Sequence, residues 1–319
     1  MELSKYDFEL VTSEFKHRHY DYFILAPNIE KRSITAYKKT FGFNRIDRIV
    51  AADYESFHVN TSEDQDRSIL LNFPEDKLTL IKAKDDPDYF KQLYDCKFPK
   101  SSSIAVDVTG FSIPTIYRIM HFFRCKLALD SIDVFYTEPK HYIYKEAYFD
   151  SYHIKTLNRP CNPIPGYFFT GKDQNEVLTI FLGFDHGLAD LVYNKLGDGG
   201  AIRTIAINGF PSYTPKLKDI SLYNNQSLIS QLQEDDVMTV TANNPFDTFN
   251  LLVKIQKQHP EVLLNICTIG CKPMALGACL FALNNLNKEN IRVTYPEYNK
   301  TEFDADEESG KTWRYGIVF

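Results

Sequence analysis

Short apolar runs alternate with longer amphipathic stretches along most of the chain. The short runs are rich in Ile, Val, Leu, Phe and Tyr, which is typical of buried strands, and the longer stretches repeat apolar residues at helical spacing. In the first half, the pattern predicts strands at 22–25, 46–50, 78–81, 104–108 and 132–136, and helices at 29–41, 86–94 and 114–127. In the second half, it predicts strands at 177–182, 202–207, 237–241, 262–267 and 291–295, and helices ending at 196, 257 and 286. This alternation predicts an α/β fold with mostly parallel sheets flanked by helices.

The alternation is interrupted once, where residues 159–166 hold three prolines and a glycine. Proline and glycine at such density mark a break between structured parts. We therefore expect an N-terminal Rossmann-like unit at 1–150, a Pro-rich linker at 151–175 and a C-terminal Rossmann-like unit at 176–319. The apolar run 313–319 is expected to be a last strand that docks into the fold.

The two halves repeat one order of elements at a nearly constant separation. Thr109 and Thr268 follow the later strand of each half, and Tyr136 and Tyr295 end the last one. Coincidence of common elements is the alternative, but we interpret the agreement as an internal duplication. Two Rossmann-like units in tandem would then form a pseudo-dimer, with a cleft on a pseudo-twofold axis.

The composition agrees with a chain of two domains, and it excludes several classes of protein. The 319 residues suit two domains, and 44% hydrophobic with 24% charged residues is ordinary for a globular protein. The 24 Phe and 20 Tyr supply a large core, which excludes wholesale disorder. A net charge of −6 provides no basic field, so direct DNA binding is not expected.

No apolar run is long enough for a membrane-spanning helix, and the N-terminus does not have the pattern of a secretory signal. The six cysteines show no paired spacing typical of a zinc site. We expect a cytoplasmic protein with free thiols, no structural metal and no cofactor. His17 and His19 lie in a basic patch that is expected to be solvated surface.

The first candidate binding loop is 183–187, directly after a predicted buried strand. Gly183 allows close backbone approach, Asp185 could bind a ribose hydroxyl, and His186 could act as acid or base near neutral pH. Capping of the following helix by Asp185 is the alternative. In the matching loop of the first half, Asn28 is a candidate cap and Arg32 could reach a phosphate, unless it is a solvated first-turn charge.

The second candidate loop lies between a buried strand and an apolar helix. Thr268, Gly270 and Lys272 would bring a hydroxyl, a flexible backbone and an ammonium group to a helix N-terminus. These groups can hold a phosphate or the edge of a nucleotide. A solvated loop lysine is the alternative for Lys272. Tyr136 and Tyr295 could stack on a base, although buried tyrosines with bonded hydroxyls would explain them as well.

The second loop resembles the motif of the CARF family, the Rossmann sensor domains of CRISPR systems, which runs Asn-x-Thr-Gly-Gly-Thr-Lys-x-Met. Thr268, Gly270, Lys272 and Met274 match it in register. The resemblance covers 176–298.

This stretch departs from the motif at Ile269 and Cys271, and Asn265 lies one residue too far upstream. The first half holds a degraded version at 107–114 that has no lysine, and Thr109 is its candidate ligand-binding residue. Two fused CARF-like units resemble the SAVED sensors of bacterial antiphage (CBASS) signalling. This resemblance implies a cyclic oligonucleotide ligand in a cleft between the two units.

Three functions are open at this point. The first is a nucleotide-sensing module of a prokaryotic antiviral system, with a protein partner that carries the effector activity. The second is a nucleotide-processing enzyme, a phosphoesterase or nucleosidase, that uses Asp185 and His186. The third is a non-catalytic interaction subunit of a defence complex. The chain contains no GxSxG, HExxH, GxxxxGK[ST] or GxGxxG motif, which favours the first and third functions.

Overall fold

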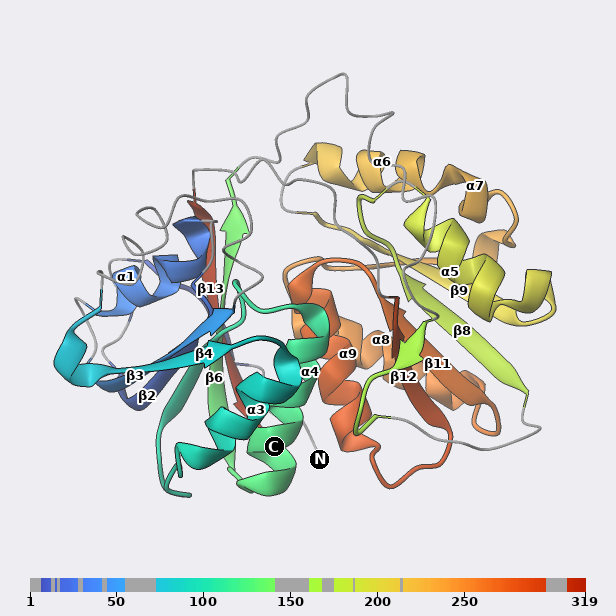
Figure 1. The fold of residues 1–319 in the computed structure, drawn as a ribbon. Coiled ribbons are helices and arrows are strands. Elements are labelled where there is room, and N and C mark those ends of the chain that lie inside the picture. The colour runs from blue at the N-terminus through green and yellow to red at the C-terminus, as the bar shows by residue number, and fades with distance from the viewer. Residues whose placement is uncertain are drawn as a thin grey trace. The chain divides into compact units, whose positions relative to one another are not determined.

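A computed structural model shows two compact units (Figure 1). The first comprises Met1–Thr115, Phe122–Ile143 and Asp304–Phe319, and the second comprises Ile116–His121 and Tyr144–Phe303. The structure describes residues 7–12, 15, 18–27, 31–41, 45–54, 73–140, 161–167, 175–185, 187–212, 215–296 and 309–319.

The first unit is built on a seven-stranded sheet with the order β1-β13-β6-β5-β2-β3-β4. Its strands are β1 (Asp7–Leu10), β2 (His19–Leu25), β3 (Arg45–Tyr54), β4 (Leu78–Ala83), β5 (Ile104–Asp107), β6 (Ser131–Pro139) and β13 (Ser309–Val318). Strands β2 to β6 pair in parallel, whereas β13 pairs antiparallel with both β6 and β1.

Helices cover both faces of this sheet. They are the 3-10 turn η1 (Lys31–Ile34) with α1 (Thr35–Phe41), η3 (Glu75–Lys77), α3 (Asp86–Asp95) and the π-helical turn η4 (Phe122–Lys126). Helix α4 (Ile113–His121) precedes η4, and its residues Ile116–His121 belong to the second unit. Phe23 of β2 contacts Tyr37 of α1. The neighbouring Tyr22 contacts Phe98, which in turn contacts Phe123 of η4. Since successive side chains of a strand point to opposite faces, these aromatic contacts form two separate layers.

The second unit contains a six-stranded sheet with the order β10-β9-β8-β11-β12-β7. Its strands are β7 (Asn162–Pro163), β8 (Glu176–Phe181), β9 (Arg203–Gly209), β10 (Val237–Val240), β11 (Leu263–Thr268) and β12 (Ile291–Tyr295), and only β7 runs antiparallel to its neighbour. Its helices are α5 (Leu188–Leu196), η6 (Asp198–Gly200), α6 (Pro215–Asn224), α7 (Gln226–Ile229), η7 (Glu234–Asp236), α8 (Pro245–Gln258) and α9 (Lys272–Asn284).

Helices α8 and α9 of this unit pack side by side (Figure 1). A Cβ at Gly277 of α9 would lie only 2.1 Å from the carbonyl oxygen of Pro245, so the small residue allows the backbones to approach. The apolar helix predicted after the second candidate loop therefore forms and is buried along nearly its whole length.

Both sheets place their five parallel strands in one spatial order. Numbered along each half, that order is third, second, first, fourth, fifth, and an antiparallel strand follows the fifth. The predicted α/β class, with two mostly parallel sheets flanked by helices, is confirmed. The shared order agrees with an internal duplication and is that of doubly wound folds.

The final strand corrects one expectation. We expected the chain from 176 to its end to lie in the second unit, but β13 lies in the first sheet between β1 and β6. The reason is the buried Arg314 of β13, which pairs with Glu9 and Asp133 from the two flanking strands. In addition, Asn162–Pro163 of the predicted linker forms β7 and pairs with β12.

Candidate functional site

The site is defined by the point in the second sheet where the strand order reverses, between β8 and β11. Strand β8 continues into residues 182–185, here called the Gly183 loop, and β11 continues into residues 269–272, the Lys272 loop. Because parallel crossovers are right-handed, the chain leaves these two strands toward opposite faces of the sheet. In open α/β sheets, ligands bind beyond the carboxyl ends of the strands at such a point.

The two loops touch through their backbones. A Cβ at Gly183 would lie 2.4 Å from the carbonyl oxygen of Ile269, and one at Gly270 would lie 2.8 Å from that of Leu182. The Ile269 N–H also donates to the Phe181 carbonyl at 3.3 Å. The structure therefore brings together the two loops that the sequence had indicated separately.

Helix α6 and Asn225, the residue directly after it, hold the Gly183 loop in place. Ser221 Oγ and Asn225 Nδ2 both donate to the Gly183 carbonyl, at 3.1 and 3.0 Å, and Asn224 Nδ2 donates to the Phe184 carbonyl at 2.7 Å. Helix α6 is not among the elements that the sequence pattern predicts. Its polar residues at i, i+3 and i+4 share one helix face and were the available signal.

The charged candidates Lys272 and Asp185 are half-buried. Lys272 is the first residue of α9, and no acidic residue occupies the first turn of this helix. The preceding Cys271 donates its Sγ–H to the Ala242 carbonyl at 3.0 Å, which ties the Lys272 loop to the end of β10. An ammonium group at the N-terminus of a helix that has no acidic residue in its first turn favours an anion. His186 lies outside the described residues.

Thr268 does not face solvent, contrary to expectation. It is fully buried, and its hydroxyl lies near that of Tyr117, in the part of α4 that belongs to the second unit. Burial raises the pKa of Tyr117 well above its usual range, and the Thr268 hydroxyl opposes this shift. As the last residue of a central strand, Thr268 points into the layer between sheet and helices.

The first sheet has a corresponding contact between β2 and β5, where a Cβ at Gly110 would lie 1.7 Å from the Ala26 carbonyl oxygen. In this sheet the candidate residues Thr109 and Arg32 form hydrogen bonds with backbone groups. Thr109 Oγ1 accepts from the Thr137 N–H at 2.9 Å and is buried, and Arg32 Nη1 donates to the Thr137 carbonyl at 2.9 Å. The expected ligand contact of Thr109 and Arg32 is thus replaced by structural bonds.

Three further candidates have different outcomes. Asn28 lies outside the described residues. Tyr136 is 3% exposed and pairs in register with Trp313, so it offers no face to a base. Tyr295 ends β12 and is half-buried.

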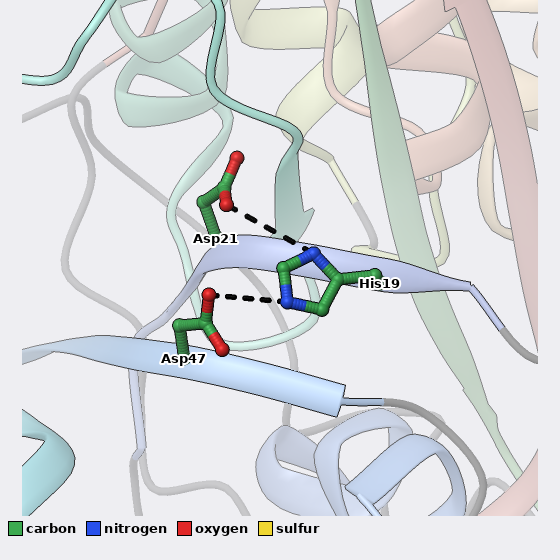
Figure 2. A group of neighbouring side chains, drawn as sticks. All are labelled: His19, Asp21 and Asp47. Atoms are coloured by element: carbon green, nitrogen blue, oxygen red, sulfur yellow. Dashed lines mark ion pairs between the residues drawn. The ribbon is translucent and has the colours of Figure 1, made fainter.

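One group of side chains has the composition of a metal site (Figure 2). His19 Nε2 lies 3.1 Å from Asp47 Oδ2, and His19 Nδ1 lies 3.9 Å from Asp21 Oδ1. The two ring nitrogens face different carboxylates, whereas one cation takes one ring nitrogen. All three side chains are well exposed. They lie near the amino ends of β2 and β3, opposite to the carboxyl ends where ligands bind. An exposed ion pair explains this geometry.

No protein-family model matches the sequence, and no curated protein matches it. Among solved structures, a candidate universal stress protein from Pseudomonas aeruginosa UCBPP-PA14 is 9% identical, with 87% of this chain and 94% of that chain covered and a TM-score of 0.26. A functionally unknown protein from Pseudomonas aeruginosa PAO1 is 10% identical, with 87% and 93% covered and a TM-score of 0.27. Structures with TM-scores this low give no information about the function of this chain. The fold class follows from the strand order of its two sheets.

Within the described part of the chain, no helix has both the length and the apolar character needed to cross a bilayer.

Proposed function

We propose that this chain is a nucleotide-sensing module whose ligand binds at the carboxyl edge of the second sheet, against the Gly183 and Lys272 loops. The observation that carries the proposal is the backbone contact between Gly183 and Ile269 at the reversal of strand order. The reversal of strand order between β8 and β11 is the place where open α/β sheets bind ligands, and the contact brings the two candidate loops together there.

Two charged residues supply the recognition chemistry. Lys272, at the N-terminus of α9, would bind a phosphate by charge and hydrogen bonding. Asp185, in the opposite loop, would accept hydrogen bonds from ribose hydroxyls. Neither role uses Thr268, which contributes to the packing beneath the loop.

The partial match of Thr268, Gly270, Lys272 and Met274 to the CARF motif supports a cyclic oligonucleotide as the ligand and a prokaryotic antiviral system as the setting. A sensor of this kind acts on a partner protein that carries the effector activity. The six free thiols suit a reducing compartment such as the cytoplasm.

The test is isothermal titration calorimetry of the full chain with cyclic tetra-adenylate, cyclic di-AMP and NAD. We expect binding of at least one probe, a loss of tenfold or more in Lys272→Ala, and a smaller loss in Asp185→Asn. Lys254→Ala, an exposed lysine of α8, is the charge-matched control and should bind as the wild type does.

The absence of binding across the three probes would overturn the proposal, and so would equal affinity in Lys272→Ala and wild type. The titrated samples are then analysed by chromatography. Conversion of a probe to product would show that the chain is a nucleotide-processing enzyme and not a sensor.

A further inference from the structure

An aromatic side chain is exposed at the same edge of the second sheet. Phe210 follows the last residue of β9 and is 48% exposed. Its backbone N–H donates to the Val240 carbonyl at 2.6 Å, and the Pro211 carbonyl accepts from the Ala242 N–H at 3.0 Å. Because bonds to the end of β10 hold the backbone on both sides, the ring is presented on a fixed base.

A lysine of α6 lies over this ring. Lys218 Nζ is 4.9 Å from the ring centroid of Phe210, a cation–π distance. The Lys218 carbonyl accepts from Asn208 Nδ2 of β9 at 3.3 Å, so the helix is fixed to the strand that precedes the ring.

The same helix connects this pair to the Gly183 loop, since Ser221 of α6 and Asn225, the residue after α6, both donate to the Gly183 carbonyl. The strand end also lies close to α9, because a Cβ at Gly209 would stand 3.3 Å from Met274 Sδ. Phe210 and Lys218 therefore lie on elements that contact the Gly183 loop and helix α9 of the candidate site.

We propose that Phe210 and Lys218 form the base subsite of the nucleotide site, with the base stacked on the face of the Phe210 ring opposite Lys218 and Lys218 paired with a phosphate of the same ligand. This inference rests on the proposed function and names the part of the site that reads the ligand's aromatic group. Base–aromatic stacking with a nearby cation is a common way to hold nucleotides without base-specific hydrogen bonds. The subsite should therefore accept different bases with similar affinity.

The first test measures affinity for cyclic tetra-adenylate and cyclic di-AMP by calorimetry. Phe210→Ala should weaken binding about tenfold or more, and Phe210→Tyr should keep it. Tyr94 of α3 is a matched control, because it is 49% exposed and lies in the first unit. Tyr94→Ala should leave the affinity for both probes unchanged. Lys218→Gln should weaken binding and reduce its salt dependence, whereas Lys218→Arg should preserve both.

The second test uses fluorescence and does not depend on loss of function. Phe210→Trp places an indole in the subsite, and a stacked base should quench its emission during the titration. Tyr94→Trp and the wild type, which has Trp313 alone, should show no quenching. The melting temperature of each variant is measured in parallel, so that unfolding is not mistaken for lost binding.

The outcomes separate the two proposals. Binding that needs Lys272 but has unchanged affinity in Phe210→Ala, with no quenching in Phe210→Trp, would overturn the base subsite and leave the proposed function intact. If no probe binds the wild type, both are overturned.

Discussion

The α-carbon of Gly183 lies so close to Ile269 that a β-carbon on it would stand 2.4 Å from the Ile269 carbonyl oxygen. The end of β8 and the beginning of the Lys272 loop are thus fixed against each other by their main chains. Gly110 and Ala26 repeat this relationship in the first sheet. A side chain at either glycine would have to push two strand ends apart.

This geometry predicts a graded response to alanine at three glycines. Gly110→Ala and Gly183→Ala meet backbone oxygens at 1.7 and 2.4 Å, whereas Gly209→Ala first meets the Ala242 side chain at 3.0 Å. We expect Gly110→Ala and Gly183→Ala each to lower the free energy of unfolding by about 1–3 kcal/mol or more, and Gly209→Ala to lower it less. Urea denaturation measures the order, and equal losses in all three would contradict it.

Arg314 is the residue whose removal should destabilise the first unit most. It is 1% exposed, and its guanidinium contacts Asp7, Glu9 and Asp133 at 2.6–2.8 Å. Arg314→Met should reduce the free energy of unfolding by about 3 kcal/mol or more, because Asp133, which is 12% exposed, is left without its main partner. Arg18→Met is the control, since that side chain is 39% exposed and its pairs are worth about 1 kcal/mol or less. A similar loss in the free energy of unfolding in both variants would show that the burial of Arg314 does not increase its contribution to stability.

The same network predicts a pH dependence. Burial opposes ionisation of Asp7, but hydrogen bonding and charge from Arg314 outweigh it and lower the pKa of Asp7 below its ordinary 3.8. A carboxyl with a lowered folded-state pKa adds stability above its unfolded pKa and loses it as the pH falls through the folded value. The difference in free energy of unfolding between wild type and Arg314→Met should therefore have its largest value at pH 7 and decrease below about pH 4. Thermal unfolding between pH 3 and 7 measures it, and a constant difference would contradict the prediction.

The cysteines should react with a thiol reagent in an order set by burial. All six are free; Cys125 is exposed, whereas Cys161, Cys267 and Cys279 are buried. Burial raises the pKa of Cys161 to about 11, so little thiolate forms at pH 8. In native protein, Cys125 should be labelled first, and Cys125→Ser should remove the fast phase. Rapid labelling of Cys161 at pH 8 before unfolding would contradict the structure.

Much of the fold follows from local pattern. The strand predicted at 291–295 is β12, and the helix predicted to end at 257 is α8, which ends at Gln258. These segments are predictable because a buried parallel strand is apolar on both faces and a capped helix carries its own start signal. Pro at the start of α8 and the Asn244 cap, which accepts from the Phe246 N–H, are such signals.

Other elements lacked a local signal. Strand β1 has a mostly exposed pattern and depends on its pairing with β13, and α6 has a weak amphipathic pattern. The site candidates show the same division. Lys272 was placed correctly at a helix start, but whether Thr268, Thr109 and Tyr136 face solvent depends on neighbours distant in sequence.

By itself, the sequence determined the α/β class, the order of elements and the two glycine loops, because hydrophobic periodicity and turn residues act over a few positions. Only the tertiary structure decided that these loops touch, that α6 binds one of them and that β13 joins the first sheet. The physical reason is that strand pairing and side-chain burial are long-range, so a residue's environment is set by partners that its local pattern does not encode.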